Sequence, residues 1–188
     1  MKRLFIIHGW GGYPEEGWFP WLKKAAEKLV WKVDILKMPN PNNPKIAGWV
    51  SFLKSNVKEL NEETFFVGHS IGCQTILRYV EKEQKKCGGI ILVAGWIHLK
   101  LLETKEEEKI AKPWLETPIE YNKIISKTDN IVAIFSTSDP FVPLSDAKIF
   151  EKNLKAKIII EKEKGHFSGS DDIKEMPSVL KELTTMSK

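Results

Sequence analysis

The stretch Thr64-Phe65-Phe66-Val67-Gly68-His69-Ser70-Ile71-Gly72 decides how this chain folds. Its first four residues form an apolar run rich in aromatic and β-branched side chains, which is typical of a buried strand. The next five have the pattern Gly-x-Ser-x-Gly, and Ile76, Leu77 and Val80 follow at helical spacing. A serine between two glycines at a strand-to-helix turn predicts a nucleophile elbow, which exposes the hydroxyl at the carboxyl end of a sheet.

Glycine on both sides of Ser70 fits this interpretation on steric grounds. The turn of an elbow is so tight that a side chain at position 68 or 72 would strike the neighbouring strand or helix, and glycine also tolerates strained backbone angles. The alternative is a glycine-rich turn that serves packing only. The position of the motif between a strand and a helix favours the elbow.

The alternation of strands and helices continues along the whole chain. Apolar runs predict strands at residues 4–7, 33–36, 64–67, 89–94, 131–135 and 156–160. Besides the helix after Ser70, helical spacing predicts helices at residues 18–29, 45–60, 144–154 and 173–183. Strands that are apolar on both faces and separated by helices imply a mostly parallel sheet covered on both sides. We therefore expect an α/β fold, a three-layer α/β/α sandwich, formed by one domain over residues 1–188.

Composition excludes several classes of protein. The 188 residues are 42% apolar and 29% charged, which is too apolar for a disordered chain. The net charge of +4 is spread along the sequence without a basic block, so we expect no nucleic-acid partner. No apolar run approaches the ~20 residues that cross a bilayer, and the apolar stretch after Met1-Lys2-Arg3 is too short for a secretory signal. Cys73 and Cys87 have no disulfide or metal-ligand spacing, and we expect a cytoplasmic protein without metal or cofactor.

His166 is the predicted general base. A serine hydroxyl needs an adjacent base that a carboxylate orients, and in this fold the chain order is serine, acid, histidine. Of the four histidines, only His166 follows the final strand, whereas His8, His69 and His98 come too early.

Asp139 is the predicted acid. It lies in the Ser-Thr-Ser-Asp-Pro loop after the strand 131–135, where it would bind the far nitrogen of His166 and fix its tautomer. Taken alone, an Asp-Pro pair is more typical of an ordinary turn. The other candidate acids lie at the wrong end of that strand, in the next helix or beyond the histidine: Asp129, Asp146, Asp171 and Asp172.

Two backbone N–H groups should bind the oxyanion that develops on the attacked carbonyl. The first is that of Ile71, the residue after the nucleophile. The second comes from the glycine-rich loop after the first strand, where we prefer Trp10 and keep Gly11 as the alternative. Such a loop can instead bind phosphate in a dinucleotide fold, but the Gly-x-Gly-x-x-Gly spacing and the P-loop lysine are absent here.

At this level of detail the sequence resembles the small α/β-hydrolase-fold serine hydrolases grouped with retinoblastoma-binding protein nine and its bacterial relatives. The resemblance spans nearly the whole chain and rests on Ile6-Ile7-His8-Gly9, Gly17-Trp18-Phe19-Pro20-Trp21-Leu22, Met38-Pro39-Asn40-Pro41, Gly68-His69-Ser70-Ile71-Gly72-Cys73, Ser138-Asp139-Pro140-Phe141-Val142-Pro143 and Gly165-His166-Phe167. It implies an α/β-hydrolase fold without a large cap domain and a triad of Ser70, Asp139 and His166. It also implies hydrolysis of carboxylic esters or related acyl bonds.

Aromatic residues near the predicted triad point to an apolar acyl pocket. Trp10, Trp96, Phe141 and Phe167 all belong to loops at the carboxyl end of the sheet, and we expect the last three to contact substrate. The charged connection 96–129 is too short for a cap domain and is interpreted as a lid-like segment. A surface helix without a role in substrate binding explains it equally well.

The sequence therefore predicts a cofactor-independent serine hydrolase that acts on small acyl substrates through an acyl-enzyme on Ser70. A thioesterase, an amidase or an aminopeptidase would use the same residues. The alternative from another class is a protein-interaction module on a hydrolase scaffold, with little or no catalysis. The sequence does not indicate an oligomeric state.

Overall fold

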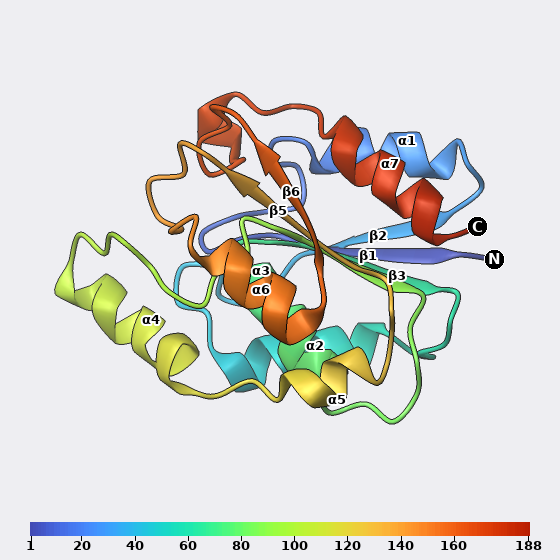
Figure 1. Cartoon of the computed structure of the whole chain (residues 1–188), viewed down its shortest axis with the longest axis horizontal. Helices are drawn as coiled ribbons and strands as arrows, with labels where there is room; N and C mark the ends of the chain where they lie inside the picture. The colour runs from blue at the N-terminus through green and yellow to red at the C-terminus, as the bar shows by residue number, and fades with distance from the viewer.

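A computed structural model covers residues 1–188 and contains a six-stranded sheet with helices on both faces (Figure 1). The strands are β1 (Arg3–Ile7), β2 (Lys32–Leu36), β3 (Thr64–His69), β4 (Gly89–Val93), β5 (Ile131–Ser136) and β6 (Lys157–Glu161). They lie in the order β2-β1-β3-β4-β5-β6, and every neighbouring pair is parallel. The predicted three-layer α/β architecture is confirmed.

Successive residues of the central strands point to opposite faces of the sheet. In β1, Phe5 and Ile7 belong to one buried cluster, while Leu4 and Ile6 belong to another. Side chains alternate along a strand with a period of two, so a strand that is apolar at every position requires cover on both faces.

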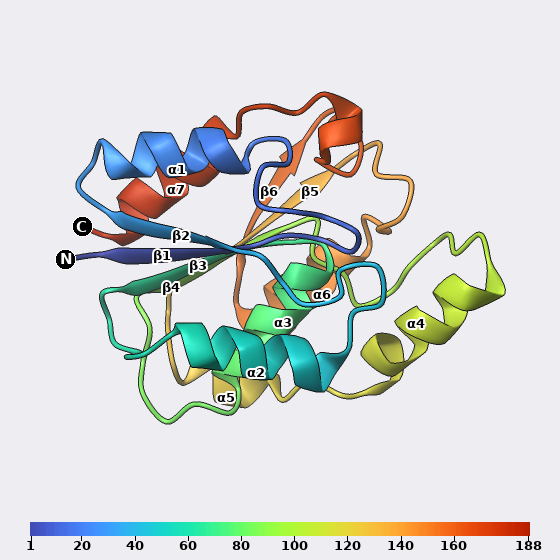
Figure 2. The same cartoon turned by 180° about the vertical axis from the view of Figure 1, so that it is seen from behind.

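The helices provide this cover (Figure 2). The face that carries Leu4 and Ile6 packs against α1 (Phe19–Glu27) and α7 (Pro177–Met186). The opposite face is covered by α2 (Ile46–Asn56), α3 (Ile71–Val80), α5 (Tyr121–Ile125) and α6 (Asp146–Leu154). The remaining helix, α4 (Lys105–Glu116), projects from this layer past the carboxyl ends of the strands. None of these helices combines the length and the apolar composition that crossing a bilayer requires.

Several elements differ at their ends from the predicted bounds. The helix expected over residues 45–60 stops at Asn56. Val57 and Leu60 are nevertheless buried, because the chain beyond the helix end packs their side chains into the core. The helix expected from residue 173 begins at Pro177, since proline lacks an N–H and suits the first turn of a helix. This helix also ends three residues later than expected, at Met186, and the other bounds shift by one or two residues.

The parallel strands bring three loops to one edge of the sheet. The loops after β3, β5 and β6 carry Ser70, Asp139 and His166 respectively. β3 and β6 are separated by β4 and β5, so the loop after β6 crosses two strands to reach the serine.

Candidate active site

Ser70 occupies the turn between β3 and α3 in a strained backbone conformation. Its φ is 54° and its ψ is −122°, a region that costs non-glycine residues on the order of 1–3 kcal/mol. Ser70 N donates to Val93 O at 2.9 Å, and Cys73 N donates to Ser70 O at 3.0 Å. The hydrogen bonds on both sides hold the serine in the conformation that a nucleophile elbow requires.

The glycines of the elbow allow backbone segments to approach closely. A Cβ on Gly72 would lie 2.4 Å from Ile7 O and 2.7 Å from His8 O. A Cβ on Gly68 would lie 2.8 Å from Cys73 Cα. Contacts this short would force the neighbouring backbone to move. The sequence-based prediction that no side chain fits at position 68 or 72 therefore holds.

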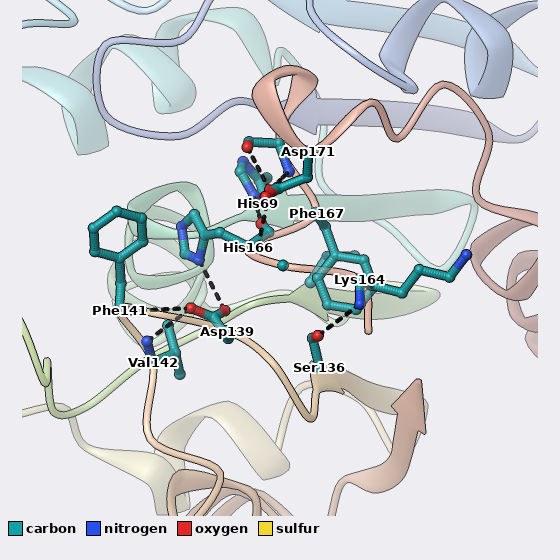
Figure 3. Close-up of polar contacts among 12 residues, drawn as sticks. His69, Ser136, Asp139, Phe141, Val142, Lys164, His166, Phe167 and Asp171 are labelled. Atoms are coloured by element: carbon teal, nitrogen blue, oxygen red, sulfur yellow. Dashed lines mark hydrogen bonds and ion pairs between the residues drawn. The ribbon is translucent and has the colours of Figure 1, made fainter. Parts of the chain in front are cut away.

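Asp139 and His166 form a hydrogen-bonded pair between two loops (Figure 3). Asp139 Oδ2 lies 2.9 Å from His166 Nδ1, and Asp139 Oδ1 accepts from Phe141 N and Val142 N at 2.8 and 2.9 Å. Burial by itself would raise the pKa of the Asp139 carboxyl. The hydrogen bond and charge of His166 and the two backbone donors outweigh burial, and they hold this pKa below its usual value. Asp139 is therefore an ionised acceptor that favours the Nδ1–H form of His166.

Ser70 and His166 line one cavity of about 410 Å³ at the carboxyl end of the sheet. The His166 ring is hydrogen-bonded to Asp139, and no hydrogen bond joins the ring to the Ser70 hydroxyl in this structure. Since Asp139 binds Nδ1, Nε2 is the nitrogen that remains for the serine. The structure thus connects two of the predicted triad residues directly and brings the third into the same cavity.

The loop after β1 lies against the serine. A Cβ on Gly9 would be 3.3 Å from Ser70 Cβ, which shows how closely this backbone approaches. The N–H of Trp10 has no acceptor in the protein, whereas the N–H of Gly11 donates to a backbone carbonyl at 2.8 Å. The N–H of Ile71, the first residue of α3, has no acceptor within its own helix. Trp10 and Ile71 are therefore free to donate to an oxyanion, while the alternative donor Gly11 is not.

The structure places two of the three predicted pocket residues on the cavity wall. Trp96 and Phe141 line the cavity, and the Phe141 ring meets the His166 ring edge-on at 5.1 Å between centroids. The prediction for Phe167 is wrong, because its side chain is fully buried in the core cluster under α1 and α7. Phe167 has a φ of 56° and its carbonyl accepts from Trp18 Nε1 at 2.9 Å, so the chain turns after His166 and the two side chains diverge.

The segment 96–129 forms one wall of the cavity and contains α4 and α5. Its lining residues are Trp96, Leu99, Leu101, Leu102, Glu103 and Glu107. A capping box fixes the start of α4, where Thr104 Oγ1 accepts from Glu107 N at 3.1 Å and Glu107 Oε2 accepts from Thr104 N at 3.1 Å. The other end is held by buried Arg78, which donates to Trp114 O at 3.0 Å.

Some residues of the site carry no clear signal in the sequence. Glu16 and Ser168 line the cavity from loops, and Ser170 lines it from the short 3₁₀ helix Gly169–Asp171. His69 is mostly buried but also lines the cavity, and its Nε2 lies 2.7 Å from His166 O. Its place immediately before the nucleophile is the one feature of the sequence that could have pointed to it.

Known proteins are similar to this chain over nearly its full length. The chain matches the profile of a family described as serine hydrolase over residues 4–185. It is 34% identical over 187 residues to YdeN of Bacillus subtilis, covering 98% of this chain and 95% of the relative. It is 27% identical over 186 residues to the serine hydrolase RBBP9 of Rattus norvegicus, covering 97% and 96%.

Solved structures share the fold. The crystal structure of the B. subtilis ydeN gene product matches with a TM-score of 0.90 at 32% identity, covering 99% of this chain and 98% of the other. Est1E from Butyrivibrio proteoclasticus, solved with bound ferulic acid, matches with a TM-score of 0.76 at 14% identity, covering 100% and 89%.

Proposed function

Because this chain belongs to the serine hydrolase family and has the α/β-hydrolase fold, we propose that it hydrolyses carboxylic esters of small substrates through an acyl-enzyme on Ser70. The observation that carries this proposal is the hydrogen bond between Asp139 and His166 at the cavity that Ser70 lines. A strained serine that shares a cavity with an oriented imidazole is the arrangement that acyl transfer requires.

In the proposed mechanism, His166 Nε2 accepts the proton of the Ser70 hydroxyl as Oγ attacks the acyl carbonyl. Catalytic hydrogen bonds are often long before substrate binds and tighten in the substrate complex. Asp139 stabilises the imidazolium through Nδ1. The N–H groups of Trp10 and Ile71 donate to the oxyanion, where loss of one donor typically costs about 3–4 kcal/mol of transition-state stabilisation.

Collapse of the tetrahedral intermediate breaks the ester bond. His166 returns the proton to the leaving alcohol, and the acyl group stays on Ser70. Water then attacks the acyl-enzyme with His166 as the base, which releases the carboxylic acid and restores the serine.

The volume and the lining residues of the cavity favour uncharged substrates of modest size. Its volume of about 410 Å³ lies in the usual range for small-molecule sites, roughly 300–1,000 Å³. Apolar residues form much of the wall, the acidic residues Glu16, Glu103 and Glu107 also line it, and no Lys or Arg does. An acyl chain that ends in a carboxylate would be repelled, so we propose that the substrates are neutral acyl esters. We further propose that the reaction takes place in the cytoplasm and needs no cofactor.

The test is hydrolysis of p-nitrophenyl acetate, butyrate, octanoate and hemisuccinate by the purified chain. We expect turnover of the neutral esters, slower turnover of the hemisuccinate than of the butyrate, and loss of activity in Ser70→Ala. Ser170→Ala is the matched control, because Ser170 lines the same cavity outside the triad and should leave turnover within about threefold. No turnover of any acyl ester by the folded wild type would refute the proposal and favour the protein-interaction module.

A further inference from the structure

The loop that carries His166 has to be fixed relative to Ser70 without help from the sheet. β3 and β6 are not neighbours, so no ladder hydrogen bond joins the strand before the nucleophile to the strand before the base. His166 also lies five positions beyond the end of β6 at Glu161. Contacts made by the loop itself must therefore set the distance between serine and imidazole.

Most contacts of this loop lead away from the nucleophile elbow. Two hydroxyls at the end of β5 hold its start, where Ser136 Oγ accepts from Lys164 N and Ser138 Oγ accepts from Gly165 N, each at 3.0 Å. Asp171 Oδ2, from the same loop, accepts from His166 N at 3.0 Å (Figure 3). These bonds shape the loop and tie it to β5, but they do not tie it to Ser70.

His69 makes the hydrogen bond that joins this loop to the elbow. Its Nε2 donates to the carbonyl oxygen of His166 at 2.7 Å (Figure 3). The His69 ring is held for this contact, since its edges pack against Trp18 and Phe19 with centroids 6.3 and 6.0 Å away. Only 4% of His69 is exposed, so burial limits the competition of water for the bond.

We propose that His69 is a positioning residue, which sets the location of the base by holding the main chain of His166 beside the nucleophile. His69 and Ser70 are consecutive, so this single hydrogen bond links nucleophile and base over a short covalent path. The inference rests on the proposed function, because it takes Ser70 and His166 as the reacting pair.

The protonation state of His69 suits this role. Burial, and after it the charge of His166, lower the pKa of His69 to about 3, while the hydrogen bond to the His166 carbonyl acts in the opposite direction. The ring is therefore neutral at pH 7, with its proton on Nε2, and Nδ1 is buried without a partner. A neutral ring can hold the carbonyl without opposing the positive charge that His166 acquires during the reaction.

The test compares His69→Phe with His69→Gln. Phenylalanine keeps an aromatic ring against Trp18 and Phe19 but has no donor, whereas the glutamine amide restores an N–H at a similar reach. A misplacement of about 1 Å in a catalytic group can cost 10²-fold in rate. We therefore expect His69→Phe to lower kcat for p-nitrophenyl butyrate by about 100-fold with KM nearly unchanged, and His69→Gln to recover at least tenfold of that loss.

Thr137→Val is the matched control for a loosened loop, because Thr137 Oγ1 accepts from Glu163 N at 3.1 Å near the start of the same loop. We expect its kcat to stay within about threefold of the wild type. A His69→Phe enzyme within threefold of the wild type, or a folded His69→Gln enzyme as slow as His69→Phe, would overturn the role of His69 alone. A wild type without esterase activity would overturn the proposed function as well.

Discussion

Replacing Asp139 by Asn exchanges one carboxylate oxygen for an NH₂ group, and the structure dictates which way the amide turns. In the wild type, Oδ1 accepts from Phe141 N and Val142 N, while Oδ2 binds His166 Nδ1. The single oxygen of Asn can serve only one side. A buried donor left without an acceptor costs about 1–3 kcal/mol, so the oxygen stays with the two backbone donors and the NH₂ group faces His166.

This orientation forces the wrong tautomer on His166. Its Nδ1 must accept from the amide, so Nε2 carries the proton and cannot take one from Ser70. By analogy with the serine protease template, we expect kcat for p-nitrophenyl butyrate to fall by about 10⁴, which is about 5.4 kcal/mol of activation free energy. The fold should survive, because Asn has the shape of Asp and keeps both backbone bonds, and circular dichroism checks this. A folded Asp139→Asn enzyme with less than a tenfold loss would refute the reasoning.

Three further predictions test the elbow, the buried imidazole and the pocket. Gly72→Ala should lower the free energy of unfolding in urea by at least the ~1–3 kcal/mol typical of overpacking, since its Cβ would meet Ile7 O at 2.4 Å; an unchanged midpoint would contradict the steric argument. Because burial lowers the pKa of His69 from 6.5 to about 3, the unfolded chain binds one more proton than the folded chain between these values. Stability should therefore fall by ~1.4 kcal/mol per pH unit as the pH drops through this window, and His69→Phe should lack that contribution; equal slopes for the two proteins would show that His69 is not buried in neutral form. Trp96→Ala should shift the preference among p-nitrophenyl esters toward longer acyl chains, because Trp96 lines the cavity; an unchanged preference would remove Trp96 from the acyl pocket.

The sheet was predictable because its four central strands, β1, β3, β4 and β5, are buried on both faces. Runs such as 89–94 are apolar at every position, and only a parallel sheet between two helical layers accommodates them. Helix ends were less predictable, since Val57 and Leu60 keep the spacing of α2 after the helix has stopped. Apolar periodicity reports burial, and burial continues into the following loop.

The site was predictable where chain order fixes it. Asp139 and His166 follow β5 and β6, so the topology alone brings them to the edge that holds Ser70. Side-chain direction within a loop is not fixed in this way. Phe167 adopts a positive φ although it is not glycine, and no pattern of residue types announces such a turn.

The acidic residues on the cavity wall could not be assigned to the site from the sequence, for a different reason. Glu107 lies in the first turn of α4 and Glu103 lies just before its N-cap, where acidic residues are expected for capping and for the helix dipole alone. Only the position of α4 at the carboxyl ends of the strands turns them toward the cavity.

The central claim is that Ser70 is the activated nucleophile, and mapping the site of a fluorophosphonate adduct tests it most directly. The folded protein is incubated with the probe at pH 7.5, digested and sequenced by tandem mass spectrometry, with Ser70→Ala and Ser170→Ala treated in parallel. We expect one adduct, on the peptide that contains Ser70, in the wild type and in Ser170→Ala, and none in Ser70→Ala. A folded wild type that remains unmodified, or an adduct that persists when Ser70 is alanine, would contradict the claim.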